Sequence, residues 1–127
     1  MNQMLSSYQH TAVSSIANSR PETLMVMLYE GMISKVKQAI EKFDAGQVVQ
    51  AREAIIRTMR IADALQENLN MENGGEVVKN LERLYDYLIT ELASANRADS
   101  PKSSLYNVLK VLEPLRDGFK QLEQKQP

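Results

Sequence analysis

Residues 102–122 read KSSLYNVLKVLEPLRDGFKQL and carry a regular apolar pattern. The large apolar residues recur at intervals of three and four, which is typical of a helix that packs along one side against other helices. These residues are Leu105, Val108, Leu112, Leu115, Phe119 and Leu122. Pro114 lies inside the pattern, and a proline removes one backbone hydrogen bond from a helix. Because the pattern continues on both sides of Pro114, we expect one helix that bends there and turns the proline toward solvent.

Three further helices are predicted upstream of this stretch. The first begins at Pro21, a residue suited to a first helical turn, and ends before Gly46. The second covers residues 47–70. The third begins at Glu76, whose carboxylate favours a first turn, and ends before Pro101. Glycine and proline therefore divide the chain into helical segments of similar length.

Short connections between these helices force successive helices to run antiparallel. The predicted fold is therefore all-α, an antiparallel up-down-up-down four-helix bundle. We expect residues 20–124 to form this bundle as a single domain. Residues 1–19 are mostly polar with scattered apolar positions, which predicts a flexible, partly ordered N-terminal tail.

The composition excludes several classes of partner. Of the 127 residues, 43% are hydrophobic and 24% are charged, as in an ordinary soluble domain. A formal net charge of -1 provides no large basic field for nucleic acid, and the absence of cysteine excludes disulfides and thiolate metal sites. No apolar stretch approaches the roughly 20 residues of a membrane span. We therefore expect a cytosolic protein without membrane insertion or nucleic-acid binding.

Residues for catalysis are scarce. The only histidine, His10, lies in the polar tail, so neither a di-iron bundle site nor a histidine phosphotransfer site can be built. No glycine-rich phosphate-binding loop occurs, and no serine has a base nearby in the sequence. The sequence predicts no catalytic residue, no metal site and no cofactor, and hence a protein that is not an enzyme.

The helix predicted for residues 47–70 carries more apolar surface than one packed face needs. Its main face consists of Val48, Ala51, Ile55, Met59, Ala62, Leu65 and Leu69. Off that face lie Val49, Ala54, Ile56, Ile61 and Ala64. One interpretation is a central helix that contacts two neighbours, and the other is a groove for a partner helix. Under the second interpretation, Ile56 and Ile61 are the best candidates to line the groove.

Two sequence blocks resemble the family of flagellar export chaperones called FliS. The first block comprises Tyr8-Gln9, then Ser19-x-Pro21, Leu24 and Met27-Leu28-Tyr29-Glu30-Gly31. The second comprises Gly74-Gly75-Glu76, Asn80-Leu81, Leu84-Tyr85-Asp86-Tyr87 and Ala95-Asn96. Both follow the order and spacing of the family pattern, and the resemblance covers roughly residues 8–120. Near the end, where the family commonly has Leu-Arg-x-x-Trp, this chain has Leu115-Arg116-Asp117-Gly118-Phe119.

The resemblance implies a chaperone of the bacterial cytosol. Such a protein binds the disordered C-terminal segment of flagellin, prevents premature polymerisation and delivers it to the flagellar type III export apparatus. Its partners would be flagellin and a component of the export gate, and the sequence leaves open a homodimer in the free state. The alternative function is a self-associating structural or regulatory helical bundle with no export client.

We expect the client-binding residues to be Ile56, Ile61, Asn80 and Tyr87. Asn80 and Tyr87 are seven residues apart and share a helix stripe away from the apolar one, where they could hydrogen-bond a client backbone. Tyr8 has no reason of core packing to be aromatic, so we expect a docking role for the tail, either over the client groove or at the export gate. Tyr85 is expected in the core with its hydroxyl in water.

Overall fold

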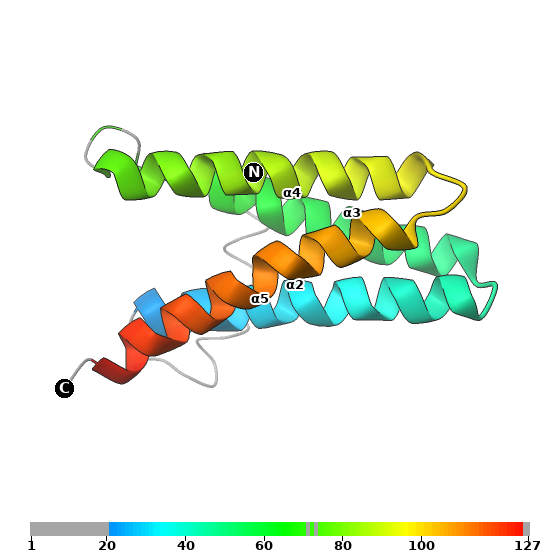
Figure 1. The fold of residues 1–127 in the computed structure, drawn as a ribbon, viewed down its shortest axis with the longest axis horizontal. Coiled ribbons are helices and arrows are strands. Elements are labelled where there is room, and N and C mark those ends of the chain that lie inside the picture. Colours follow the sequence, from blue (N-terminus) through cyan, green and yellow to red (C-terminus); the bar gives the residue numbers. More distant parts are fainter. Residues whose placement is uncertain (1–20, 71, 73, 126–127) are drawn as a thin grey trace.

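The computed structural model describes residues 21–70, 72 and 74–125, and this part of the chain forms four α-helices (Figure 1). They are α2 (Pro21–Asp44), α3 (Val48–Glu67), α4 (Gly75–Arg97) and α5 (Lys102–Lys125). Successive helices run antiparallel, so the predicted all-α, up-down-up-down four-helix bundle is confirmed. The expected N-terminal tail, with Tyr8 and His10, lies outside the described residues.

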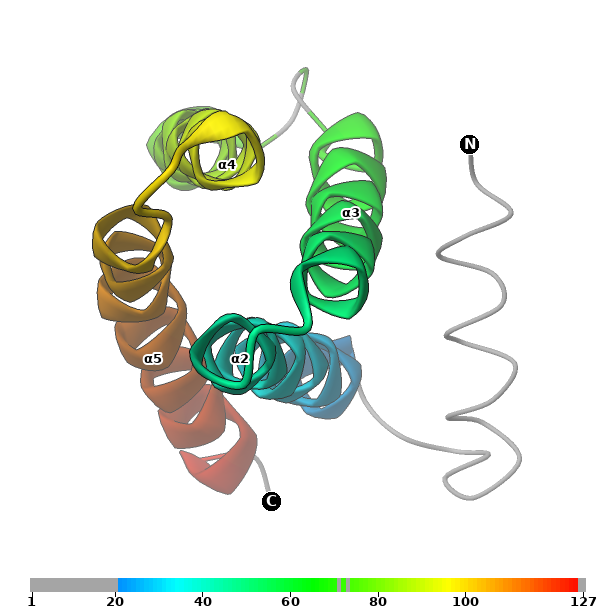
Figure 2. The same cartoon turned by 90° about the vertical axis from the view of Figure 1, so that its right-hand side faces the viewer.

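The four helices form a ring in which each helix packs against two neighbours. Helix α2 lies between α3 and α5, and α4 closes the ring on the other side by packing against the same two helices (Figure 2). The backbones of α2 and α4 do not approach each other in the described part of the chain, so side chains fill the space between them. The centre of the ring is therefore the core.

Helix α3 ends at Glu67, three residues before the expected end at Asn70. The amide Nδ2 of Asn68 donates a hydrogen bond to the carbonyl oxygen of Ala64 at 2.7 Å, and the backbone N–H of Asn68 also reaches that oxygen. Asparagine side chains compete with the helical backbone in this way. The expectation was wrong because the apolar position Leu69 continues the pattern beyond the point where the backbone leaves the helix.

The burial of side chains on α3 explains why this helix carries more apolar residues than one packed face needs. Ala54, Ile61 and Ala64 are all buried, and Ile61 is only 1% exposed and belongs to the core cluster. A helix that packs between α2 and α4 must bury a wide arc, which explains these positions. The expectation that Ile61 lies off the core is therefore wrong. Val49 and Ile56 do remain exposed.

The apolar seam of α5 is buried most completely in its first half. Leu105, Val108 and Leu112 are fully buried, whereas Phe119 is half-buried and Leu122 is 46% exposed. The expected core role of Leu122 is therefore not realised. In the second half of α5, Leu115 and Phe119 therefore pack at the edge of the core, and Leu122 lies outside it.

Pro114 interrupts the hydrogen bonding of α5 without ending the helix. The helix runs continuously from Lys102 to Lys125, and Pro114 is exposed, as expected. We predict that Pro114→Ala raises the free energy of unfolding by about 1 to 2 kcal/mol, because it returns the N–H that the carbonyl of Lys110 lacks. Chemical denaturation of both proteins measures the change. Equal or lower stability of the alanine variant would mean that the bundle requires the distortion imposed by proline.

None of the helices within residues 21–70 and 74–125 is both long and apolar enough to cross a membrane.

Candidate functional site

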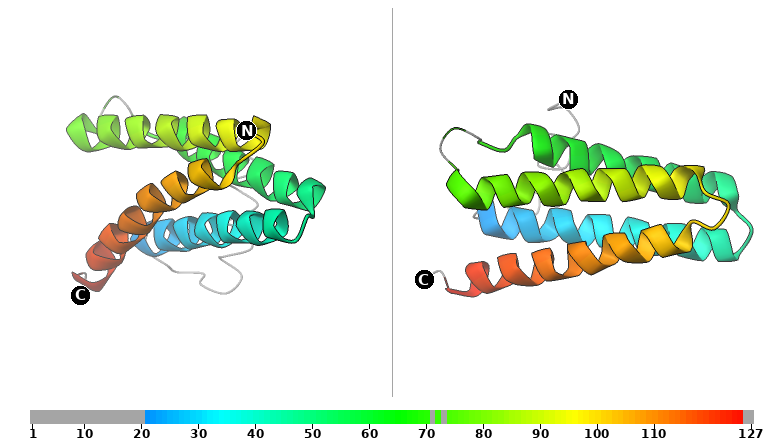
Figure 3. Two further views of the ribbon diagram at one scale, coloured as in Figure 1. Left: turned by 45° about the vertical axis from the view of Figure 1, so that its right-hand side comes forward. Right: turned by 45° about the horizontal axis from the view of Figure 1, so that its top comes forward.

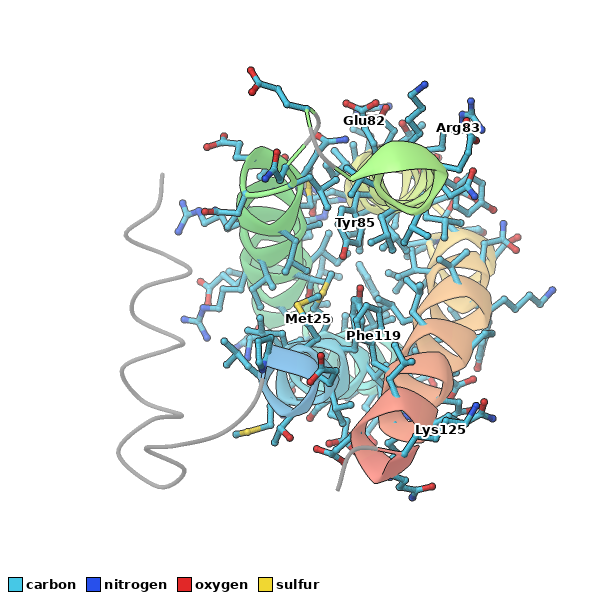
Figure 4. All side chains as sticks on the ribbon, turned by 90° about the vertical axis from the view of Figure 1, so that its left-hand side faces the viewer. Met25, Glu82, Arg83, Tyr85, Phe119 and Lys125 are labelled. Atoms are coloured by element: carbon cyan, nitrogen blue, oxygen red, sulfur yellow. The ribbon has the colours of Figure 1, made fainter. Side chains whose placement is uncertain are left out.

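An apolar cavity of about 250 Å³ lies at the end of the bundle where α2 and α4 begin and α3 and α5 end. All four helices contribute to its wall. The lining residues are Leu24, Met25, Leu28, Leu65, Asn68, Leu69, Leu81, Tyr85 and Phe119. Figure 4 views the bundle from this end and shows Met25, Tyr85 and Phe119 pointing toward its centre, whereas Glu82 and Arg83 project outward. The wall of this cavity is thus formed mainly by apolar side chains that face the centre of the bundle.

A pair of tyrosines forms the polar centre of the core beside this cavity. The hydroxyl groups of Tyr29 on α2 and Tyr85 on α4 share a hydrogen bond of 2.6 Å, and both side chains are buried. Burial raises the pKa of each phenol above its ordinary value, because the charged form would lose its hydration. The ring of Phe119 lies 5.5 Å from that of Tyr29 at a tilted angle. The expected contact of the Tyr85 hydroxyl with water is replaced by the contact with Tyr29.

The tyrosine pair joins the two sequence blocks described above. Tyr29 comes from the first block and Tyr85 from the second, although 56 residues separate them. Their hydrogen bond connects the two helices that do not touch through their backbones. Sequence reasoning missed this contact. Each tyrosine lies on an apolar stripe, which predicts burial, but nothing in one sequence shows which buried hydroxyl meets which.

The residues predicted to bind a client do not form one surface. Ile56 is 37% exposed on α3, whereas Asn80 and Tyr87 are exposed together on α4, and Ile61 is inside the core. Asn80 accepts a hydrogen bond from the guanidinium of Arg83 at 3.2 Å. Asn80 and Tyr87 therefore share a stripe of α4 that faces away from the core, as expected. Ile56 lies on another helix.

Polar contacts also connect α4 to α5 near the loop that joins them. Glu91 on α4 accepts hydrogen bonds from the hydroxyl of Tyr87 at 3.2 Å and from the amide of Asn107 on α5 at 2.7 Å. Further from the loop, a cavity of about 280 Å³ opens between the two helices. Its lining residues are Leu84, Lys110, Val111, Pro114 and Leu115. Sequence reasoning did not identify this surface, because it assigned Leu115 to the packed face of the helix and did not consider Val111.

Within the described residues, no three acidic or histidine side chains lie close enough together to hold a metal ion. The features that remain are apolar surfaces and hydrogen-bonding groups, which suit the binding of another polypeptide.

Comparison with known proteins identifies relatives over almost the full length. The family described as "Flagellar protein FliS" matches residues 2–126. The flagellar secretion chaperone FliS of Salmonella typhimurium is 31% identical over 118 residues, which cover 92% of this chain and 87% of that protein. FliS of Vibrio cholerae is 26% identical over 123 residues, covering 96% and 90%. The flagellar secretion chaperone FliSB of Pseudomonas aeruginosa is 29% identical over 113 residues, covering 88% and 89%.

Proposed function

The chain belongs to the FliS family of flagellar secretion chaperones, and we propose that its client is flagellin. In this proposal the protein binds the disordered C-terminal segment of flagellin in the bacterial cytosol and prevents premature polymerisation. It then delivers the subunit to the flagellar type III export apparatus, where a component of the export gate is its second partner. The family is one of chaperones and not of enzymes.

The observation that carries the proposal is the family match over residues 2–126. This range includes all four helices and both blocks that meet at Tyr29 and Tyr85. The relatives share the whole bundle with this chain and not one isolated motif. The match therefore best supports a function that uses the surface of the whole bundle.

The distribution of apolar side chains also supports a polypeptide client. Large apolar side chains remain exposed on three helices, at Val48, Val49, Ile56, Val77, Tyr87, Tyr106 and Leu122. Exposed apolar side chains that lie next to one another mark interaction surfaces, and these residues are the candidates for such contacts. A disordered segment that folds as it binds can wrap around a bundle and cover separate faces, at a cost in conformational entropy that a long apolar contact offsets.

The proposed client contacts are Ile56 on α3 and Asn80 and Tyr87 on α4. Ile61 is closed to a client in this conformation because the core surrounds it. Tyr8 remains a proposed docking residue of the tail, either as a cover of the client groove or at the export gate. A long segment could reach Ile56 and Tyr87 in a single complex, because both side chains are exposed on neighbouring helices.

The direct test mixes the full chain with a peptide that spans the C-terminal segment of flagellin, and measures the mass of the complex by sedimentation. We expect a one-to-one complex. Dimers that form at rising protein concentration and ignore the peptide would contradict the proposal and support the self-associating alternative.

We predict that Ile56→Asp weakens peptide binding about tenfold, or roughly 1.4 kcal/mol, while the bundle keeps its melting temperature within a few degrees. The side chain is already partly in water, so the charge costs the free protein little. Isothermal titration calorimetry gives the affinity. Gln50→Asp is the matched control, because Gln50 is an exposed polar residue on the same helix. Equal affinities for all three proteins would remove Ile56 from the client surface.

A further inference from the structure

The apolar cavity at the end of the bundle has a buried floor and a partly exposed mouth. The floor consists of Leu28, Leu65 and Tyr85, which are at most 5% exposed. The other lining residues, among them Leu24 and Phe119, are half-buried or exposed. At this end of the bundle the second half of α5 diverges from α4 and approaches the beginning of α2 (Figure 3). The helix ends therefore surround a space that a small molecule can enter from solvent.

The tyrosine pair beside this cavity has one more hydrogen-bond donor than it uses. Each phenol carries one proton, and the bond of 2.6 Å between the hydroxyls of Tyr29 and Tyr85 takes only one of the two. Neither hydroxyl makes another hydrogen bond within the described residues. Both side chains are at most 1% exposed, and a buried donor without an acceptor is costly. The second proton therefore depends on an acceptor that enters the cavity.

Tyr85 is the member of the pair that can present this proton to a ligand. Tyr85 lines the cavity, whereas Tyr29 does not. When the hydroxyl of Tyr29 donates the shared bond, the oxygen of Tyr85 accepts it and the proton of Tyr85 stays available. An acceptor bound in the cavity would select this orientation of the two hydroxyls.

The rest of the wall has little to offer a polar ligand. Every lining residue except Asn68 and Tyr85 is apolar. The amide Nδ2 of Asn68 already donates to the carbonyl oxygen of Ala64. A buried water usually makes about three hydrogen bonds, and this wall provides few partners for them. The cavity therefore suits a molecule that is apolar over most of its surface and carries one acceptor.

The volume and the wall indicate the size and shape of that molecule. An apolar cavity of about 150 Å³ is large enough for benzene, so by proportion a cavity of about 250 Å³ holds about ten non-hydrogen atoms. The ring of Phe119 and the thioether of Met25 lie in the wall, and both groups make favourable contacts with aromatic rings. A rigid ring also loses little conformational freedom on binding.

We propose that this cavity binds a small aromatic molecule of about ten non-hydrogen atoms, whose acceptor oxygen receives a hydrogen bond from Tyr85. An aromatic ketone has this chemistry. The residues proposed to contact a polypeptide client, Ile56, Asn80 and Tyr87, do not line the cavity. The site is therefore separate from those contacts, and its test does not depend on flagellin.

The test compares acetophenone with isopropenylbenzene, in which a methylene group replaces the ketone oxygen. Both compounds are titrated against the full chain and against the double replacement Tyr29→Phe and Tyr85→Phe, which removes both hydroxyls. The ratio of the two dissociation constants is compared between the proteins, because the different hydration of the two free compounds then cancels. Circular dichroism melting verifies that the double variant is folded.

Methyl resonances of methionine in nuclear magnetic resonance spectra measure binding and locate it. Met25 lines the cavity, so the ring current of a bound aromatic compound should shift its methyl signal. Met59 is the internal control, because it is a half-buried methionine that packs against the core and does not line the cavity. The variants Met25→Leu and Met59→Leu assign the two resonances.

We expect acetophenone to bind the original chain with a dissociation constant below about 1 mM and to shift the signal of Met25 but not that of Met59. The preference for acetophenone over isopropenylbenzene should fall about tenfold in the double variant, because the ketone oxygen then enters a cavity without a donor.

Three results would overturn the inference. Absence of binding by either compound up to its solubility would show that the cavity accepts no ligand of this class. An unchanged preference in the double variant would show that the phenol proton does not meet the ligand, as when a bound water retains it. Shifts of Met59 that equal or exceed those of Met25 would place the compounds elsewhere on the protein.

Discussion

Ile61→Asp should unfold the bundle, with a loss of about 5 kcal/mol or more in the free energy of unfolding. The side chain is 1% exposed and belongs to the cluster that α3 forms with its neighbours. Aspartate would remove an apolar group from that cluster and bury a carboxylate for which the surrounding apolar residues offer no partner. Because a domain is stable by only about 5 to 15 kcal/mol, this single change should abolish cooperative folding.

Far-ultraviolet circular dichroism during heating measures the effect of Ile61→Asp. Ile56→Asp is the control, because it introduces the same charge on the same helix at a position that is 37% exposed. We expect the control to melt cooperatively and the Ile61 variant to show no transition. A native-like melting curve for Ile61→Asp would mean that α3 is rotated relative to the arrangement described above.

The second large effect is expected in alkali, because Tyr29 and Tyr85 are buried as a pair. Their pKa values are raised above the ordinary value near 10, so in the folded protein both phenols stay neutral where the unfolded chain ionises. Their contribution to stability is complete below pH 10 and is lost as the pH rises further. Above pH 10, each phenol that stays neutral in the folded protein lowers the free energy of unfolding by about 1.4 kcal/mol per pH unit. Tyr29 alone should therefore remove about 2 kcal/mol between pH 10 and 12, and Tyr85 adds to this loss.

Urea denaturation at a series of pH values measures this alkaline loss. The matched variant is the double replacement Tyr29→Phe and Tyr85→Phe. It removes both hydroxyls, so no buried hydroxyl is left without a hydrogen-bond partner. We expect its stability to fall much less between pH 10 and 12. Tyr85→Phe alone should cost about 1 to 3 kcal/mol at neutral pH, because it strands the Tyr29 hydroxyl in the core. An alkaline loss of the same size in the double variant would show that other groups cause it.

The sequence determines the helices of this protein well because each one has a strong local signal. The alternation of three and four residues predicts α5 even across Pro114, where propensity alone would end the helix. The least accurate boundary is the end of α3. There the apolar pattern continues to Leu69, while the side chain of Asn68 bonds the backbone and ends the helix at Glu67.

The candidate site is harder to predict because it depends on angles between helices. Periodicity gives the direction of each side chain around its own axis, but not how far α5 diverges from α4. For this reason Leu122 reads as a core residue in the sequence and is 46% exposed in the structure. The hydrogen bonds from Asn107 to Glu91 and between Tyr29 and Tyr85 could not be predicted for the same reason, because each connects two helices.

Hydrogen exchange of the full chain with and without the flagellin C-terminal peptide tests whether this bundle is a flagellin chaperone. We expect slower exchange of amides in α3 near Ile56 and in α4 from Asn80 to Glu91, together with the second half of α5. Amides around Lys37 in α2, on a side that these contacts do not include, should be unaffected and serve as the internal control. Exchange that is unchanged in every helix at saturating peptide would contradict the claim that this bundle is a flagellin chaperone.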